Sequence, residues 1–566
     1  MRPMHMRFAL LKTRTLLAAL VAVALQTVAA HAAAPGITGP TFNLTAQPSY
    51  LTQPDGQSVY SWGYGCSSTP AGFAPAMTGQ TCPTMQVPGP TLIVNEGDTV
   101  TVKLTNNLPP SAGNTSMLFP GFTMLQFSDG TPGLLTQEAA NGATVTYSFV
   151  ASAPGTRSYY SGTQSDLQVE MGLYGAIIVL PTKASTFAQC TAGLPLTNPG
   201  ANAIAKTNKS QAHLGLDELD FRLAPAAYDS AKTCYDREYL FQFSEIDPNI
   251  HLQAESQVAA CSNSTATCTL QVPTEPYHPA YFMINGRSMP DDMDPNYATQ
   301  YPHQPYNGNP HMHPGELVLL RIIGQGRWQH PFHEHANHVR ILARDGNLIL
   351  TQDGNALAGP ALFTTTTTPG LAMDGIFYYT GRGLNWDMYG HNPASPNKTA
   401  FNVDPPCVAD SNGYYTKDPT AVNYFEWCQD HEKPVQAYPF GDITGGGPVT
   451  LPDPNLLTNG AWYGGSPYLG PDATLRGNAP ACVGSPYGPA NPTTPSGGAG
   501  TPAVNTSNCT NLNPSNLQLN PANERGWAFM WHSHNEREIT TNNVFPGGML
   551  MMMLVDTRGF VIDEHL

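Results

Sequence analysis

The chain has 566 residues, and only 12% of them are charged, compared with about 25% in ordinary soluble domains. Its formal net charge of −16 argues against nucleic acid and anionic membrane surfaces as partners, because both are negatively charged. The 53 glycines and 53 prolines break helices and indicate short strands joined by turns.

The first 32 residues have the pattern of a secretory signal peptide. Four basic residues precede an apolar stretch at 16–25, and small residues at 30–32 are typical of a cleavage site. Removing this segment would leave a net charge of −20. The apolar stretch is too short to span a membrane, and no other reaches about 18 residues. The sequence therefore predicts a secreted or periplasmic protein with no membrane span.

Ten cysteines in an exported chain indicate disulfide bonds. Their order favours local pairs, although spacing alone does not fix the connectivity. The expected pairs are Cys66–Cys82, Cys190–Cys234, Cys261–Cys268, Cys407–Cys428 and Cys482–Cys509. No CxxC pattern occurs and no cysteine adjoins a histidine, so a thiolate metal site is not expected.

The first folded unit is predicted to be all-β, over residues 40–182. Residues 99–104 and 144–149 alternate apolar and polar side chains with the strand period, and 175–180 form a short apolar run. Short strands with Gly/Pro turns are typical of a β-sandwich.

A linker or irregular segment is expected at 183–235, followed by a second unit at 236–566. Its expected strands share β-branched, aromatic or aliphatic runs and lie at 239–243, 316–323, 339–342, 527–531 and 549–555. The methionines of the last strand are interpreted as core packing rather than as a thioether copper site. Residues from about 385 to 523 are rich in Pro, Gly and Asn, which predicts a long irregular insertion in this unit.

Three His-x-His pairs occur, where random placement of 17 histidines predicts about half of one. Residues i and i+2 of a strand point to one face, so each pair directs two imidazoles to one place. Prolines flank His311 and His313, which favours a structural doublet in a loop. The pairs His333/His335 and His532/His534 lie far apart in the chain, and their four imidazoles would together make a copper or zinc site.

Several motifs resemble the multicopper oxidase family of the cupredoxin fold. The first unit carries Pro-Gly-Pro-Thr-Leu at 88–92, Pro-Gly-Thr at 154–156 and Gly-Leu-Tyr-Gly-Ala at 172–176. The second carries His-Pro-Phe-His-Glu-His at 330–335 and Trp-His-Ser-His at 531–534. The resemblance implies an all-β protein with two cupredoxin-like Greek-key β-sandwich domains. The two histidine motifs are its most specific part.

The chain departs from the family pattern in the first unit. The family's first two His-x-His motifs fall here on Leu118 and Pro120, and on Tyr160 and Gly162. All four first-domain histidines are therefore absent. In the family these complete a trinuclear copper cluster, so His333, His335, His532 and His534 correspond to half of that cluster.

The family's type 1 copper centre is also incomplete. By resemblance its cysteine position holds Ser533, its second histidine position holds Glu538, and only His330 matches. A serine hydroxyl is a poor copper ligand, whereas the blue centre depends on a soft thiolate. We therefore expect no blue centre. His330 and Glu538 are secondary metal candidates, for which a backbone-bonded histidine and a solvated glutamate are the favoured interpretations.

The leading hypothesis is an exported copper-binding protein, and by resemblance a copper-dependent oxidoreductase. The first alternative is a non-catalytic extracellular or periplasmic scaffold or binding protein that keeps the cupredoxin fold. The second is that the same imidazoles hold zinc, or no metal. The sequence identifies neither a substrate nor a redox partner, and an oligomer is compatible with it.

Overall fold

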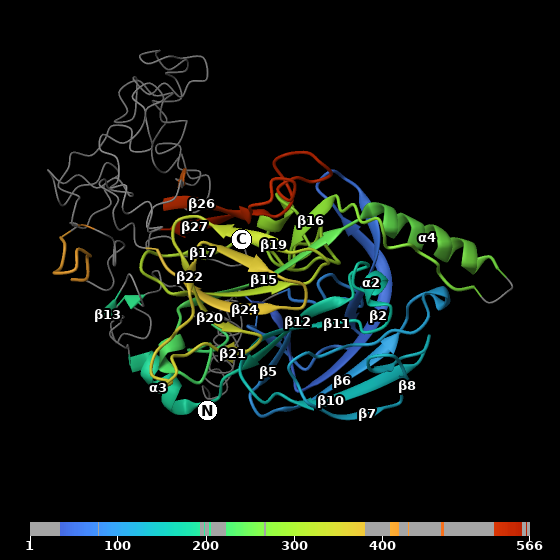
Figure 1. Ribbon diagram of the computed structural model, residues 1–566, viewed down its shortest axis with the longest axis horizontal. Coiled ribbons are helices and arrows are strands. Elements are labelled where there is room, and N and C mark those ends of the chain that lie inside the picture. Colours follow the sequence, from blue (N-terminus) through green and yellow to red (C-terminus); the bar gives the residue numbers. More distant parts are fainter. Residues whose placement is uncertain are drawn as a thin grey trace, which may run out of the picture.

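The computed structural model describes residues 34–76, 79–192, 197–198, 203–204, 222–264, 268–379, 408–417, 428, 466–468, 526–556 and 562. These residues form four large β-sheets that lie in layers, from the sheet of β26 and β27 to the sheet of β10 and β7 (Figure 1). The expected signal peptide and most of the expected insertion lie outside the described residues.

The first two sheets form one β-sandwich from residues 36 to 180. Their strand orders are β11-β12-β5-β1-β4 and β3-β2-β6-β10-β7. The strands are β1 Gly36–Thr38, β2 Thr41–Thr52, β3 Ser58–Cys66, β4 Phe73–Ala74, β5 Leu92–Asn95, β6 Thr99–Asn106, β7 Met124–Ser128, β10 Thr144–Val150, β11 Gly155–Tyr160 and β12 Tyr174–Leu180. Burial alternates along β6 and β10, which confirms the two strands predicted from alternation.

The other two sheets form the second β-sandwich. Their orders are β16-β15-β18-β24-β20-β21, with β22 on β20, and β17-β27-β26-β19-β23, with β25 on β26. The strands are β15 Arg237–Ile246, β16 Tyr281–Ile284, β17 His311–Met312, β18 Val318–Gly324, β19 His330–Glu334, β20 Val339–Arg344, β21 Asn347–Leu348, β22 Ala361–Leu362, β23 Thr364–Thr367, β24 Ala372–Phe377, β25 Ser466–Tyr468, β26 Gly526–Ser533 and β27 Leu550–Asp556. Within its described residues the expected insertion contributes one short strand, β25, which the sequence did not predict.

Strand order in both sandwiches is non-sequential. Parallel neighbours such as β2 with β6 and β15 with β18 occur beside antiparallel pairs. Such connections between two packed sheets produce the all-β cupredoxin-like sandwich that the sequence predicts. Two further pairs of very short strands, β8 Thr131–Pro132 with β9 Gln137–Glu138 and β13 Thr197–Asn198 with β14 Ala203–Ile204, lie outside the four sheets.

The structure contains helices that the Gly/Pro content did not suggest. They are α2 Ser165–Gln168, α3 Ala184–Ala192 and α4 Pro248–Ser262, with 3-10 turns η1 Pro110–Ala112, η2 Ala231–Thr233 and η3 Asp291–Met293. At the start of α4 the Asp247 carboxylate accepts a hydrogen bond from the backbone N–H of Asn249, 2.9 Å away, and Pro248 occupies the first helical position. Helix α4 buries Ile250 and Ala254 in the core of the first sandwich, so it links the two units.

The sandwiches also meet through one sheet of each. Ala176 and Ile178 of β12 pack against Leu240, Ile323 and Ala372 of the sheet that contains β15, β18 and β24. The other sheet of the second sandwich, which contains β19 and β26, lies on the far side of that layer (Figure 1).

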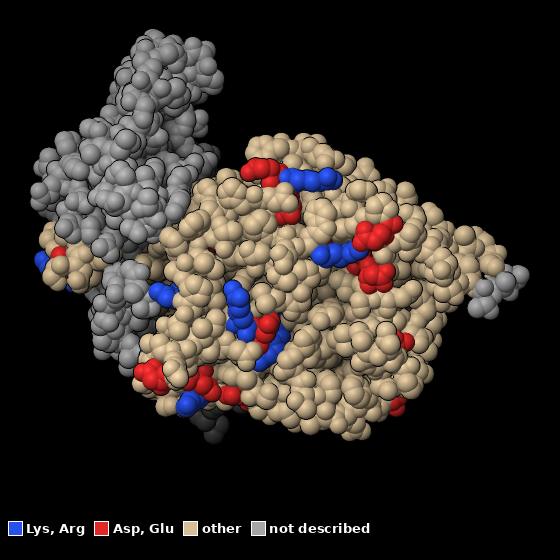
Figure 2. Space-filling model, in the orientation of Figure 1, with Lys and Arg blue, Asp and Glu red and all other residues tan. Residues whose placement is uncertain are grey.

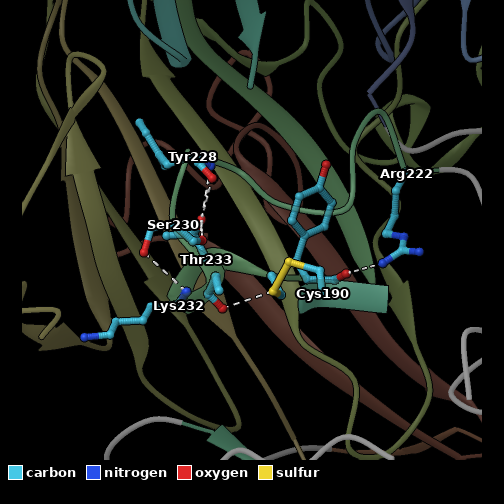
Figure 3. The surroundings of a disulfide bond; sticks show 9 residues. Cys190, Arg222, Tyr228, Ser230, Lys232 and Thr233 are labelled. Atoms are coloured by element: carbon cyan, nitrogen blue, oxygen red, sulfur yellow. Dashed lines mark hydrogen bonds between the residues drawn. A yellow bond between two sulfur atoms is a disulfide. The ribbon is translucent and has the colours of Figure 1, made fainter. Parts of the chain in front are cut away.

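Three predicted disulfides, Cys66–Cys82, Cys190–Cys234 and Cys261–Cys268, are present. Figure 3 shows the second, where α3 is joined to the chain just after η2. There Arg222 donates to the carbonyl of Tyr235 at 2.8 Å. The segment expected as a linker therefore includes a helix, α3, which a disulfide joins to Cys234 just before β15. The pair Cys482–Cys509 and the residue Cys407 lie outside the described residues.

The visible surface is sparsely charged. Figure 2 shows Lys, Arg, Asp and Glu in a few small groups separated by wide uncharged areas, in keeping with the low charged content. Within the described ranges, none of the helices has the length and apolar character needed to cross a membrane.

Candidate metal centre

Two antiparallel strands carry the His-x-His pairs. Strands β19 and β26 are neighbours, and their register places His333 directly opposite His532. His335 and His534 follow two residues later in each segment and so face the same side. Phe332 and Trp531, which alternate with the histidines, point into the core of the second sandwich. The four histidines therefore lie on the outer face of their sheet.

The four imidazoles, which we call the quartet, lie close together. Ring centroids are 4.9 Å apart for His333–His335 and His333–His534, 5.3 Å for His335–His532, and 5.6 Å for His333–His532 and His532–His534. The Nε2 atoms of His335 and His532 are 3.3 Å apart. The structure thus brings together residues that the sequence separates by about two hundred positions.

The surroundings of His333, His335 and His532 favour neutral imidazoles. Burial, together with the neighbouring imidazoles, lowers the pKa of His333 and of His335 to about 4. Burial also lowers the pKa of His532. Neutral imidazoles offer the lone pair that a metal ion needs, and no proton has to be displaced first near neutral pH.

Hydrogen bonds orient two of these rings. The Nδ1 of His532 lies 2.7 Å from the carbonyl oxygen of Ser533, which can only accept, so this nitrogen carries the proton and Nε2 carries the lone pair. The Nδ1 of His333 lies 2.8 Å from the hydroxyl of Thr364. Partners of this kind on the remote ring nitrogen fix the orientation of metal-binding histidines.

The spacing of two quartet nitrogens fits a shared ion. Two imidazole nitrogens bound to one tetrahedral ion at about 2.0 Å lie about 3.3 Å apart. The distance between Nε2 of His335 and Nε2 of His532 is also 3.3 Å. Among the residues that the structure describes, no three or more His, Cys, Asp or Glu side chains are already arranged as a metal site. The donor set therefore fits copper or zinc, because two imidazole nitrogens have a spacing that one ion could share and two further rings are adjacent.

One side of the quartet is open to solvent. His534 is exposed, and so is Phe363, whose ring packs edge-on against His333 with centroids 5.7 Å apart. The same phenylalanine contacts His338 at 5.1 Å. The quartet is therefore accessible to solvent at His534.

His330 belongs to a different environment. It is fully buried on the core side of β19, with Nε2 2.9 Å from Glu245 and Nδ1 2.9 Å from Glu538. Burial opposes its charge, but the hydrogen bonds to the two carboxylates raise its pKa to about 9. The expectation of a histidine bonded to backbone is wrong, because its ring nitrogens face carboxylates.

Glu538 is also not the solvated glutamate that the sequence favoured. Its side chain is fully buried, and it accepts hydrogen bonds from the Ser533 hydroxyl at 2.5 Å and from the Asn535 amide at 2.8 Å. Ser533 and Glu538 occupy the positions where the family places a thiolate and a second histidine. Here they are hydrogen-bonded to each other and form one buried network with His330. It offers no soft ligand for a blue copper ion.

Glu245 was not identified from the sequence, although the alternation of side chains along β15 places it on the core-facing side. In β15, residues Tyr239, Phe241 and Phe243 face the core of the second sandwich, and Glu245 is the next residue on that face. A carboxylate at a core position requires a partner. Its partner, His330, comes from a strand more than eighty residues later.

The first-domain positions that replace the family's histidines lie elsewhere. The backbone N–H of Leu118 donates to the carbonyl of Tyr160 at 2.7 Å, and a side chain at Gly162 would meet that of Leu118. Leu118 and Tyr160 pair with each other within the first sandwich, whereas the quartet belongs to the sheet of β19 and β26 in the second.

The remaining His-x-His pair is a hydrogen-bonded structural doublet, as expected, although it begins strand β17 rather than lying in a loop. His311 Nδ1 lies 2.8 Å from the Asp556 carboxylate, and His313 Nδ1 lies 3.0 Å from the Asp556 carbonyl. Met549, Met551 and Met553 are fully buried in the core, which confirms their packing role.

The family model that matches this chain falls in the first sandwich. A family model described as multicopper oxidase matches residues 78–184. The multicopper oxidase MCE of Talaromyces pinophilus is 38% identical over 98 residues, which are 17% of this chain and 15% of that protein. Copper resistance protein A of Escherichia coli is 37% identical over 102 residues, 18% and 16% of the two chains. Over residues 78–184 the chain is multicopper oxidase-like.

The chain spans about a sixth of the length of those curated relatives. A solved multicopper oxidase, mgLAC, covers 92% of this chain and 87% of its own at 14% identity, with a TM-score of 0.40. That score is too low to demonstrate a shared fold. The fold assignment follows from the sheets described above.

Proposed function

We propose that the quartet binds copper, and that the protein is an exported copper-dependent oxidoreductase without a type 1 blue centre and with half of a trinuclear cluster. The observation that carries the proposal is the 3.3 Å distance between the Nε2 atoms of His335 and His532, beside two further imidazoles. A nitrogen–nitrogen spacing that suits one ion has no obvious use in a scaffold alone.

The residues of the quartet would act as follows. His335 and His532 hold the ion through Nε2, and His333 and His534 lie within reach of further coordination. The Ser533 carbonyl and the Thr364 hydroxyl hold two of the rings in orientation. Copper bound there supplies one electron at a time, by cycling between Cu(I) and Cu(II).

A substrate would have to approach the quartet itself. In the described part of the chain, the cysteine relay position holds Ser533, which is hydrogen-bonded to Glu538. The solvent-facing side formed by His534 and Phe363 is the accessible approach. We therefore propose that a substrate would approach the quartet from the side of His534 and Phe363.

The test is the metal content of protein matured with ample copper, measured by elemental analysis with electron paramagnetic resonance. We expect bound copper in the wild type, its loss in the double variant His335→Ala/His532→Ala, and its retention in the control His311→Ala, which changes a structural histidine. Zinc would be silent in the resonance experiment. Absence of copper and redox activity in the wild type would contradict the proposal. Activity that survives replacement of all four histidines would favour the scaffold alternative.

A further inference from the structure

A buried series of hydrogen bonds runs from the first sandwich to the strands that carry the quartet. The Tyr277 hydroxyl lies 2.7 Å from Glu170 of the first sandwich and 3.3 Å from Glu245 of β15. Glu245 then contacts His330 of β19, and His330 contacts Glu538, each at 2.9 Å. None of the residues in this hydrogen-bonded series belongs to the quartet.

Each carboxylate in this series has several donors. One oxygen of Glu245 accepts from the backbone N–H groups of Arg327 and Trp328, at 2.5 and 2.8 Å. Glu538 accepts from Ser533 through one oxygen and from Asn535 through the other. Buried charges are tolerated only when their geometry is good and their lone pairs are satisfied, and these conditions make such a network rigid.

The network holds both metal-site strands from the face opposite the quartet. Ser533 lies between His532 and His534, so its side chain points to the core side while the two imidazoles point outward. Its hydroxyl donates to Glu538 and accepts from the backbone N–H of Asn535 at 3.2 Å. His330 precedes His333 by three residues and likewise faces the core.

We propose that Glu538, Ser533 and His330 are positioning residues that hold the two His-x-His segments at the spacing a shared metal ion requires. The inference rests on the proposed copper function and extends it to residues that touch no metal. The ion network at the family's type 1 position thus has a role of its own: it cross-links β19 to the segment after β26, directly behind the quartet.

The test compares copper affinity and paramagnetic resonance spectra of the wild type with those of Ser533→Ala and Glu538→Gln. Ser533→Ala removes only a hydroxyl and is the milder change. It therefore still tests the inference if Glu538→Gln does not fold. Loss of an outer partner of metal ligands typically lowers affinity 10- to 100-fold. We expect that loss in both variants, together with an altered copper hyperfine pattern.

The matched control is Glu238→Gln. Glu238 is a fully buried carboxylate of the same strand β15, but it lies seven residues before Glu245, on the opposite face, and pairs with Arg321 at 2.9 Å. This variant should keep the wild-type copper spectrum and affinity. Wild-type spectra and affinities in both Ser533→Ala and Glu538→Gln would overturn this inference and leave the copper function intact. A wild-type protein that binds no copper would overturn both.

Discussion

Replacing His330 by glutamine should change how the stability of the protein depends on pH. The hydrogen bonds to Glu245 and Glu538 raise the pKa of His330 to about 9 in the folded protein, against 6.5 in the unfolded chain. At 1.36 kcal/mol for each pH unit, this difference is worth about 3 kcal/mol. Because the folded pKa is the higher one, the contribution is fully present below pH 6.5 and is lost as the pH rises through 9.

The assay is urea unfolding of the wild type and of His330→Gln at pH 6 and at pH 9.5. Groups common to both proteins cancel in the difference between their unfolding free energies. That difference should fall by about 3 kcal/mol between the two pH values. A difference that stays constant would refute the charged Glu–His–Glu arrangement, since a neutral His330 would give no such dependence.

Three further predictions concern the neighbourhood of the quartet. His532→Ala should abolish copper binding in elemental analysis, and retention of full copper occupancy would show that the ion lies elsewhere. Trp531→Ala should cost about 3–5 kcal/mol in urea unfolding, because this fully buried ring packs among three phenylalanines, and a loss below 1 kcal/mol would contradict that packing. Ser533→Cys alone should produce no intense blue absorption, because Glu538 replaces the second histidine ligand and His330 remains bonded to carboxylates; a blue protein would disprove this.

Local patterns were sufficient to predict eight of the strands in the four large sheets. The alternation at 99–104 and 144–149 corresponds to β6 and β10, and the apolar run at 175–180 corresponds to β12. Helix α4 was missed because overall Gly/Pro content says nothing about one segment, whereas Asp247 and Pro248 at its start form a local signal. Strand β25 was missed because Ser466–Tyr468 shows no strand pattern and gains its order from pairing with β26.

The site could be predicted only where it depends on local spacing. The i, i+2 period placed the two imidazoles of each pair on one face, and the resemblance suggested that the pairs would meet. The environment of His330 could not be predicted, because Glu245 and Glu538 come from strands and loops far away in the sequence. A single glutamate is usually solvated, and only the three-dimensional pairing of two carboxylates with one imidazole makes burial favourable here.

Locating the metal itself would show whether the quartet binds copper. Anomalous X-ray scattering from crystals of copper-matured protein, recorded at the copper absorption edge, should show a peak about 2.0 Å from the Nε2 atoms of both His335 and His532. A copper-replete crystal with no peak there, and with the two nitrogens joined by a hydrogen bond instead, would contradict the account.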